Sequence, residues 1–328
     1  SQGDLIDYDN NLDGSRTLNH LLVGSNDPVA LLALANDSSK NWMARATFLK
    51  KENDITDYWK EATPGGRRIF TYNGTSQVPF LWDNLSVAQK NSLDLATLLD
   101  PDGDPDTNDE EDPADAQGLY FSPVLNFIRG DRSLEADMTD GYLRKRYSLL
   151  GDITASPLYI GPPRELFANL EGYAEFRAAK DGRAGVIAGP ANDGMLHIFA
   201  EADGSEIMGY IPSMVIDKLN NLTERAYEHT YFWDGELVAG SAQVNPDAAN
   251  CGDAVDGDGK KVEDSDCDWR TVLTGGGGAG LEGLIALDMT ATGFTNSKIL
   301  FEKSGGVFGH VYGTPRIAPL GSTAEPDW

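Results

Sequence analysis

The sequence is poor in the residues on which most catalytic and metal sites depend. Its 328 residues include only 4 histidines and 2 cysteines. The histidines form no H-E-x-x-H motif, no cysteine cluster could hold zinc, and a G-x-S-x-G nucleophile elbow is absent. These absences count against a zinc hydrolase and a serine hydrolase. The scattered histidines are His20, His197, His229 and His310. His197 alternates within MLHIF, which predicts a packed or hydrogen-bonded strand residue rather than a base.

Basic residues and long apolar runs are also scarce. Lysine and arginine total 26 against 52 aspartates and glutamates, which gives a formal net charge of −26. This charge repels nucleic-acid phosphates and anionic lipid headgroups, so a nucleic acid is not expected as a partner. It favours divalent cations or a saline medium, because carboxylate repulsion must be neutralised or screened. No apolar run approaches the roughly 20 residues that span a bilayer.

The two cysteines, Cys251 and Cys267, enclose the polar loop CGDAVDGDGKKVEDSDC. They are either two unrelated thiols or, in an exported protein, a disulfide. Closing a loop of this length would stabilise the fold by ~3 kcal/mol in the chain-entropy model. Aspartates alternate in the loop, but Lys260 and Lys261 interrupt them and no acid stands at the closing position. A surface loop is therefore predicted here rather than an ion site.

A second acidic stretch, DPDGDPDTNDEED over residues 100–112, has the spacing of a calcium loop. Calcium takes six to eight oxygen ligands, and the EF-hand supplies them from alternate positions with a closing glutamate. Pro105 stands where that loop requires glycine, so a solvated acidic insertion is the alternative. The predicted calcium ligands are Asp100, Asp102, Asp104, Asp106, Asn108 and Glu111.

The rest of the chain indicates a mainly β protein. It has 36 glycines and 16 prolines, and short runs of Val, Ile, Leu and Tyr stand between turn residues. Residues 1–80 are expected to be β-rich, with strands in VALLALA, WMARATFLK and RRIFTYNG. Residues 81–144 are expected to form a helical insertion that carries the acidic loop, with a capping box at Ser86 and Gln89 and a second helix near Pro123.

Residues 145–328 show an imperfect internal repeat. AGVIAGPANDGMLHIFAEADGSEI and RTVLTGGGGAGLEGLIALDMTATG each contain a buried strand, a glycine turn, an alternating strand and a second turn. Repeats of this kind are typical of propeller blades. At roughly 40 to 50 residues per blade the region would hold about four, too few to close a typical ring. The predicted fold is therefore an incomplete, modified quinoprotein-like β-propeller with a few helical insertions, whose C-terminal blades are missing from this chain.

Several motifs occur together in a fixed order. They are RRIFTYNG, FLWDNLS, NFIRGDRS, YSLLGDITASPLYIG, ANDGMLHIF, GYIPSMVIDKLNNL, HTYFWDG and WRTVLTGGGGAGLEGLIALDMT. In this order they resemble the type IV pilus tip-associated adhesins of the PilC/PilY type, over roughly residues 40 to 320.

The resemblance implies an exported, extracellular protein at the pilus tip, whose C-terminal part is a β-propeller. It implies minor pilins as partners, a role in pilus assembly and surface attachment, and modulation by Ca²⁺ bound in an acidic loop. Many family members carry a von Willebrand-type domain upstream, and we expect none within residues 1–328. An enzyme is not expected. The alternatives are a pyrroloquinoline-quinone propeller oxidoreductase, for which no complete cofactor-binding set is found, and a structural scaffold that needs no ion.

Two short motifs are predicted to be structural. Arg129-Gly130-Asp131 spells an integrin-type tripeptide, but it lies at the end of an amphipathic helix, where Arg129, Asp131 and Arg132 are expected to make local ion pairs. Gly275, Gly277 and Gly280 match the G-x-G-x-x-G spacing of dinucleotide sites. The following LIALDMT alternates like a strand, which predicts a tight turn between strands instead.

Overall fold

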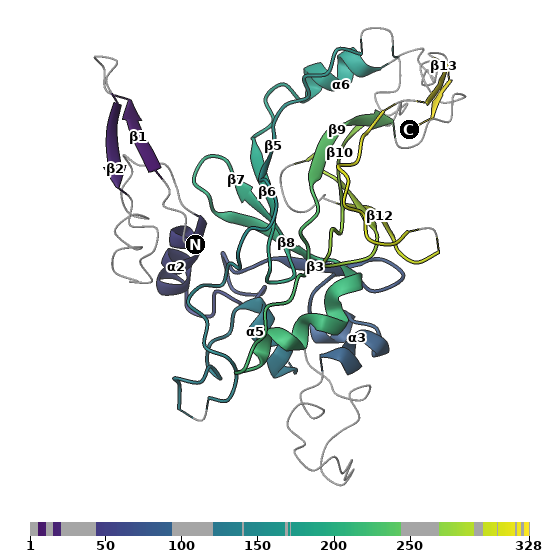
Figure 1. Ribbon diagram of the computed structural model, residues 1–328. Helices are drawn as coiled ribbons and strands as arrows, with labels where there is room; N and C mark the ends of the chain where they lie inside the picture. Colours follow the sequence, from purple (N-terminus) through teal and green to yellow (C-terminus); the bar gives the residue numbers. More distant parts are fainter. Residues whose placement is uncertain are drawn as a thin grey trace, which may run out of the picture.

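The computed structural model shows a mainly β chain (Figure 1). It describes residues 6–10, 16–20, 44–93, 121–139, 141–167, 170, 172–243, 269–291, 298–306, 308–318, 320–322 and 325–327. The strands are β1 (Ile6–Asn10), β2 (Arg16–His20), β3 (Ile69–Tyr72), β4 (Gln77–Pro79), β5 (Leu158–Ile160), β6 (Val186–Pro190), β7 (Leu196–Ala200), β8 (Glu206–Ile211), β9 (Leu237–Gln243), β10 (Trp269–Gly276), β11 (Leu284–Asp288), β12 (Lys298–Lys303), β13 (Leu320–Ser322) and β14 (Glu325–Asp327). The helices are α2 (Ala44–Asp54), η1 (Trp82–Asn84), α3 (Val87–Ser92), α5 (Pro123–Arg129), α6 (Tyr173–Ala179) and η2 (Ser213–Thr223).

Two sheets dominate the fold, and each contains a four-stranded antiparallel meander. The first runs in the order β4-β3-β8-β7-β6-β5, and the second in the order β12-β11-β10-β9. Strands β5 to β8 and β9 to β12 each follow one another in both sequence and space, while β3 adds to the edge of β8 in parallel. The first strands of the two meanders, β5 and β9, lie beside each other. This is the arrangement expected of two consecutive propeller blades.

The predicted repeat corresponds to the middle strands of both meanders. Its first copy forms β6 and β7, and its second copy forms β10 and β11. The described residues thus hold two such meanders where spacing alone suggested about four. Long connections account for part of the difference, because residues 212–236 join the meanders and residues 244–268 separate β9 from β10.

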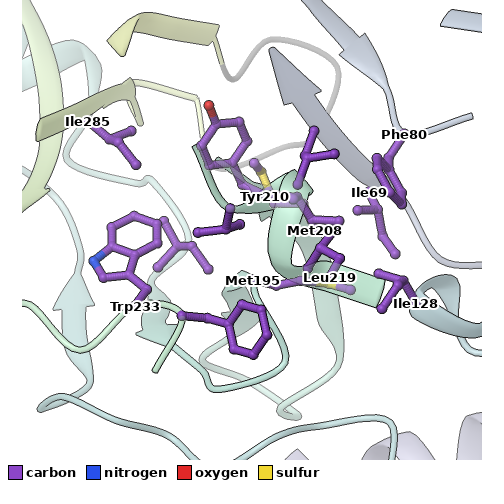
Figure 2. Close-up of a cluster of buried hydrophobic side chains, with 14 of the residues drawn as sticks. Ile69, Phe80, Ile128, Met195, Met208, Tyr210, Leu219, Trp233 and Ile285 are labelled. Carbon is purple, nitrogen blue, oxygen red and sulfur yellow. The ribbon is translucent and has the colours of Figure 1, made fainter. Parts of the chain in front are cut away.

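One hydrophobic core joins the two sheets (Figure 2). Met195, which precedes β7, and Tyr210 of β8 lie in one cluster with Ile285 of β11 and with Trp233, which precedes β9. Leu219 of η2 lies in the same cluster. The buried side chains of η2 are spaced for one face of a helix, which explains why this connection packs onto the sheets. They are Val215, Ile216, Leu219, Leu222 and Thr223.

Polar contacts also connect the two meanders. Glu302 of β12 accepts hydrogen bonds from the Tyr210 hydroxyl and from the Ser213 backbone N–H and hydroxyl. On the other side, the Arg183 guanidinium donates to the Thr271 hydroxyl at 2.6 Å. Tyr210 and Glu302 lie in strands of different sheets, and Arg183 joins the segment before β6 to β10, so the sheets are held together by more than apolar packing.

Most of the predicted elements that fall within the described residues are confirmed, with one correction, while the strand predicted in VALLALA lies outside those residues. WMARATFLK was predicted as a strand, but α2 begins at Ala44 and is a helix. Ala46 and Phe48 are its buried residues, and their spacing of two imitates a strand. The residues that follow in α2, LKKEND, include good helix formers, and these extend the helix. The capping box at Ser86 and Gln89 is present, and α5 begins at Pro123 as predicted.

Candidate functional site

Four charged side chains, here called the buried charge cluster, meet where β7, β8 and the segment before β3 come together. Arg67 donates through Nε and Nη2 to the Glu206 carboxylate at 2.7 and 2.8 Å. His197 lies between two carboxylates, with Nδ1 2.8 Å from Glu206 and Nε2 3.0 Å from Asp193. Because both ring nitrogens face acceptors, the imidazole must carry two protons. Two cations therefore balance two anions.

Burial and mutual attraction set the protonation states in this cluster. The side chains of Arg67 and His197 are 0% exposed and that of Glu206 is 1% exposed, whereas Asp193 is 15% exposed. Burial alone would lower the pKa of His197, but the Asp193 and Glu206 carboxylates raise it to about 9. Burial alone would raise the pKa of Glu206, but Arg67 and His197 lower it to about 2. All four groups are thus charged at neutral pH.

Arg129 of the R-G-D tripeptide belongs to the support of this cluster. The Arg129 side chain is buried and donates to the backbone carbonyls of Trp59, Phe80 and Arg67 at 3.1, 2.9 and 2.9 Å. In return, Arg67 donates to the Arg129 carbonyl at 2.8 Å. The structural interpretation is confirmed, although the contacts seen for Arg129 are to carbonyl groups. A buried arginine cannot present the tripeptide to a receptor.

A second ionic group adjoins α5. Arg132 pairs with Glu52 at 2.7 Å and with Glu135 at 3.2 Å, and Arg146 pairs with Glu135 at 2.8 Å. The ion pair predicted for Arg132 is therefore present. Burial lowers the pKa of Arg146 to about 10, and its attraction to Glu135 offsets part of that effect. This group fastens the 144–152 segment to the end of α5.

A cleft of about 450 Å³ opens beside both ionic groups. Its walls come from the second half of α5, the 144–152 segment, the β6–β7 turn and the segment after η2. Asp193 of the buried charge cluster lines it, and so does Arg146. Ligand sites commonly have volumes of about 300 to 1,000 Å³, so the cleft is large enough for a small ligand.

The glycine-rich stretch is a turn between strands, as predicted. Residues 277–283 connect β10 to β11, which pair in antiparallel fashion, so no helix follows to receive a pyrophosphate. Asp234 accepts from the backbone N–H groups of Ala279 and Gly280 at 2.6 and 3.0 Å. A Cβ at Gly280 would lie 2.3 Å from the Phe232 carbonyl carbon. Glycine is required at position 280 because any side chain would collide with the Phe232 backbone.

The predicted ion and disulfide residues lie outside the described residues. These are Asp100, Asp102, Asp104, Asp106, Asn108 and Glu111 of the acidic loop, and Cys251 and Cys267. Within the described ranges, no group of three or more His, Cys, Asp or Glu side chains is placed to hold a metal ion. In that same part of the chain, no helix is both long and apolar enough to cross a membrane.

Sequence reasoning placed His197 correctly but did not find its partners. Asp193 and Glu206 stand within the same predicted hairpin, four residues before and nine residues after His197. Acidic residues flanking an inward-facing histidine in one hairpin are the signal that could have found them. Arg67 carries no comparable signal, because 139 residues separate it from Glu206.

Comparison with known proteins agrees with this architecture. Residues 150–310 match a family model described as the PilY1 beta-propeller domain, and this range contains both meanders. A PilY1 homolog of Xylella fastidiosa, a type IV pilus biogenesis factor, is 34% identical over 211 residues, covering 62% of this chain and 15% of the relative. The type IV pilus biogenesis factor PilY1 of Pseudomonas aeruginosa strain UCBPP-PA14 is 31% identical over 312 residues, covering 87% of this chain and 23% of the relative.

A crystal structure of the Pseudomonas aeruginosa PilY1 C-terminal domain is 29% identical and covers 49% of this chain and 29% of that one. Its TM-score of 0.33 does not establish a shared arrangement. The fold defines a mainly β protein built from propeller-like meanders. By its sequence the chain belongs to the PilY1-type family. It spans less than a quarter of the length of these two relatives, at 15% and 23%.

Proposed function

We propose that this protein acts in type IV pilus biogenesis. The observation that carries the proposal is the match of residues 150–310, with their two meanders, to the PilY1 beta-propeller domain. The relatives are type IV pilus biogenesis factors. A rigid head of stacked sheets suits a protein that is displayed on a filament and makes contacts through its loops.

The finer part of the proposal concerns place and partners. We propose that the protein is extracellular, sits at the pilus tip with minor pilins, and serves as an adhesin for surfaces. Exposed aromatic side chains support a contact role, because aromatic residues are enriched at protein interfaces. Tyr147 and Tyr312 are 68% and 69% exposed, and Tyr231 is 52% exposed.

The decisive test is genetic. We expect deletion of the gene in its own bacterium to reduce surface pili, and the full-length gene to restore them, with sheared pilin measured by immunoblot. An unchanged amount of sheared pilin from the deletion strain would refute the biogenesis role. Adhesion is tested separately in strains that cannot retract pili and carry equal pilus numbers, where loss of attachment alone indicates an adhesin. Co-purification of minor pilins with the full-length protein tests the partner assignment.

We further propose that Ca²⁺ binds the acidic loop from Asp100 to Glu111 and modulates this activity. The support is the donor set, which consists of oxygen atoms alone, as a hard cation requires. An ion that binds only the folded protein stabilises it by RT ln(1 + [L]/Kd), which is ~2.7 kcal/mol at a hundredfold excess over Kd. This stabilisation would favour those states of the pilus tip in which the ion-binding form of the loop is present.

Calorimetry distinguishes this proposal from an ion-independent scaffold. We expect heat on calcium titration and a higher melting temperature in calcium than in chelator, both reduced in the Asp100→Ala, Asp104→Ala double variant. Asp181→Ala is the matched control, because Asp181 is an exposed aspartate in a turn after α6. The same heat and the same calcium-dependent shift in the double variant and in wild type would contradict the assignment of these ligands.

A further inference from the structure

The cleft beside the buried charge cluster has a charge opposite to that of the chain. Four of its lining residues are basic, namely Arg45, Arg144, Lys145 and Arg146, and two are acidic, Asp152 and Asp193, which leaves an excess of two positive charges. The whole chain carries a net charge of −26. A local reversal of sign in a concave surface concentrates the field and attracts anions.

Three of these six charged residues already have partners. Arg146 is paired with Glu135 and also donates to the Asp131 carbonyl at 2.6 Å. Lys145 pairs with Asp137 at 2.7 Å. Asp193 is held by His197 at 3.0 Å and accepts from the Gly151 N–H. These groups shape the cleft, and their charges are largely balanced.

Arg144 is different. Its Nε donates to the Leu222 carbonyl at 2.9 Å, and its guanidinium lies over the Tyr227 ring at 4.2 Å from the centroid. These contacts fix the plane of the guanidinium, yet its two terminal Nη atoms donate to no residue in the described ranges. Burial lowers the pKa of Arg144, and the nearby Tyr227 and Glu135 offset only part of that effect. A fixed guanidinium with two uncommitted nitrogens is suited to a bidentate acceptor.

Two neutral donors line the same cleft. The Ser148 oxygen accepts from the Leu150 N–H at 3.1 Å, and the Tyr227 oxygen accepts from the Thr230 N–H at 3.3 Å. Both hydroxyl groups therefore have their protons left to donate, and neither donates to another described residue. Together with Arg144, these two hydroxyl groups offer several hydrogen-bond donors, so the matching ligand is one that only accepts hydrogen bonds. A deprotonated anion meets that requirement.

Most of the remaining lining is apolar or aromatic, and Asn192 and His229 add polar groups that contact each other. Phe127, Ile128, Leu149 and Leu222 contribute to the walls, and Tyr147 lines the cleft with 68% of its side chain exposed. Phosphate sites usually gather several cations or the backbone N–H groups of a helix N-terminus. This cleft instead places one oriented arginine beside an apolar wall, which matches a planar carboxylate attached to an apolar group.

We propose that this cleft binds the carboxyl terminus of a peptide chain whose last residue is apolar. Arg144 receives the carboxylate in a bidentate pair, and Ser148 and Tyr227 donate to its remaining lone pairs. The terminal side chain packs on Leu149 and Leu222. Capture of a chain terminus by oriented donors is a recurring mode of peptide recognition. The inference does not depend on the pilus role, since it rests on the lining of the cleft alone.

The test uses the full chain and a defined probe, N-acetyl-Ala-Leu as the free acid, with the same dipeptide as its amide for comparison. By isothermal titration calorimetry at low salt, we expect the amide to bind at least about 10-fold more weakly, because it cannot form the charge-assisted pair. We expect Arg144→Gln to lose a similar factor and Arg144→Lys to lose less. Arg225→Gln is the control, since Arg225 donates to the Tyr142 and Gly141 carbonyls outside the cleft.

Because Arg144 also contacts Leu222 and Tyr227, melting temperatures are measured for every variant. Ser148→Ala keeps the guanidinium and its contacts, and we expect it to weaken the free acid several-fold and the amide less, because a hydroxyl donates more strongly to a charged acceptor. Absence of heat with the free acid, equal binding of acid and amide, or full binding by a folded Arg144→Gln variant would each overturn the proposal. Inorganic phosphate that binds in the cleft more tightly than the free acid would also overturn it.

Discussion

The buried charge cluster should make stability depend on pH in the alkaline range. His197 has a pKa of 6.5 when solvated and about 9 in the fold. A raised pKa means that its contribution is fully present below pH 6.5 and is lost as the pH rises through about 9. The difference corresponds to about 3 kcal/mol of unfolding free energy at full burial. Glu206, with its pKa lowered to about 2, keeps its contribution above pH 4.5 and loses it towards pH 2.

The assay is urea unfolding followed by tryptophan fluorescence, at fixed calcium and from about pH 6 to about pH 9. We expect the free energy of unfolding to fall by up to about 3 kcal/mol across this range in wild type, and much less in His197→Gln, which cannot gain that proton. The other three histidines, His20, His229 and His310, are the same in both proteins, so the difference between the two isolates His197. The charged groups around His197 are Asp193, Glu206 and Arg67, and none of them changes charge in this range. Equal pH slopes in the two proteins would refute the reasoning.

Two further predictions concern the glycine turn and the cysteines. Gly280→Ala should destabilise the fold by about 2 kcal/mol or more, because its Cβ would meet the Phe232 backbone at 2.3 Å; Gly182→Ala, with nothing within 4 Å, should be nearly neutral. Equal melting temperatures of these two variants would show that the turn relaxes freely. If Cys251 and Cys267 form the predicted disulfide, the protein unfolded without reductant should show no reactive thiol, whereas two titratable thiols would exclude the bond.

The strands were largely predictable because short apolar runs, buried along most of their length or alternating as in β3, stand between glycine turns. GLIALDMT and RRIFTYNG, for example, gave β11 and β3. The α2 helix was not predictable from its first half, where Ala46 and Phe48 are spaced like strand residues. The parallel pairing of β3 with β8 could not be predicted either, since it joins segments that are far apart in the chain.

The candidate site was less predictable than the fold. His197 was placed in a packed strand, but the protonation of its ring depends on Arg67, Glu206 and Asp193 together, and only the three-dimensional structure brings them into contact. Arg144 looks like any basic residue in LRKRYS. Its role follows from which of its nitrogens are engaged, and that information is geometric.

The parallel pairing of β3 with β8 has a consequence for how this protein is made. The family match begins at residue 150, but β3, which pairs with β8 at the edge of the first meander, lies at residues 69–72. During synthesis, β3 emerges long before its partner, so it must wait for β8 before it can dock. A fragment cut at residue 150 would leave the β8 edge open to other chains and Glu206 buried without Arg67. The folding unit is therefore longer than the stretch that defines the family.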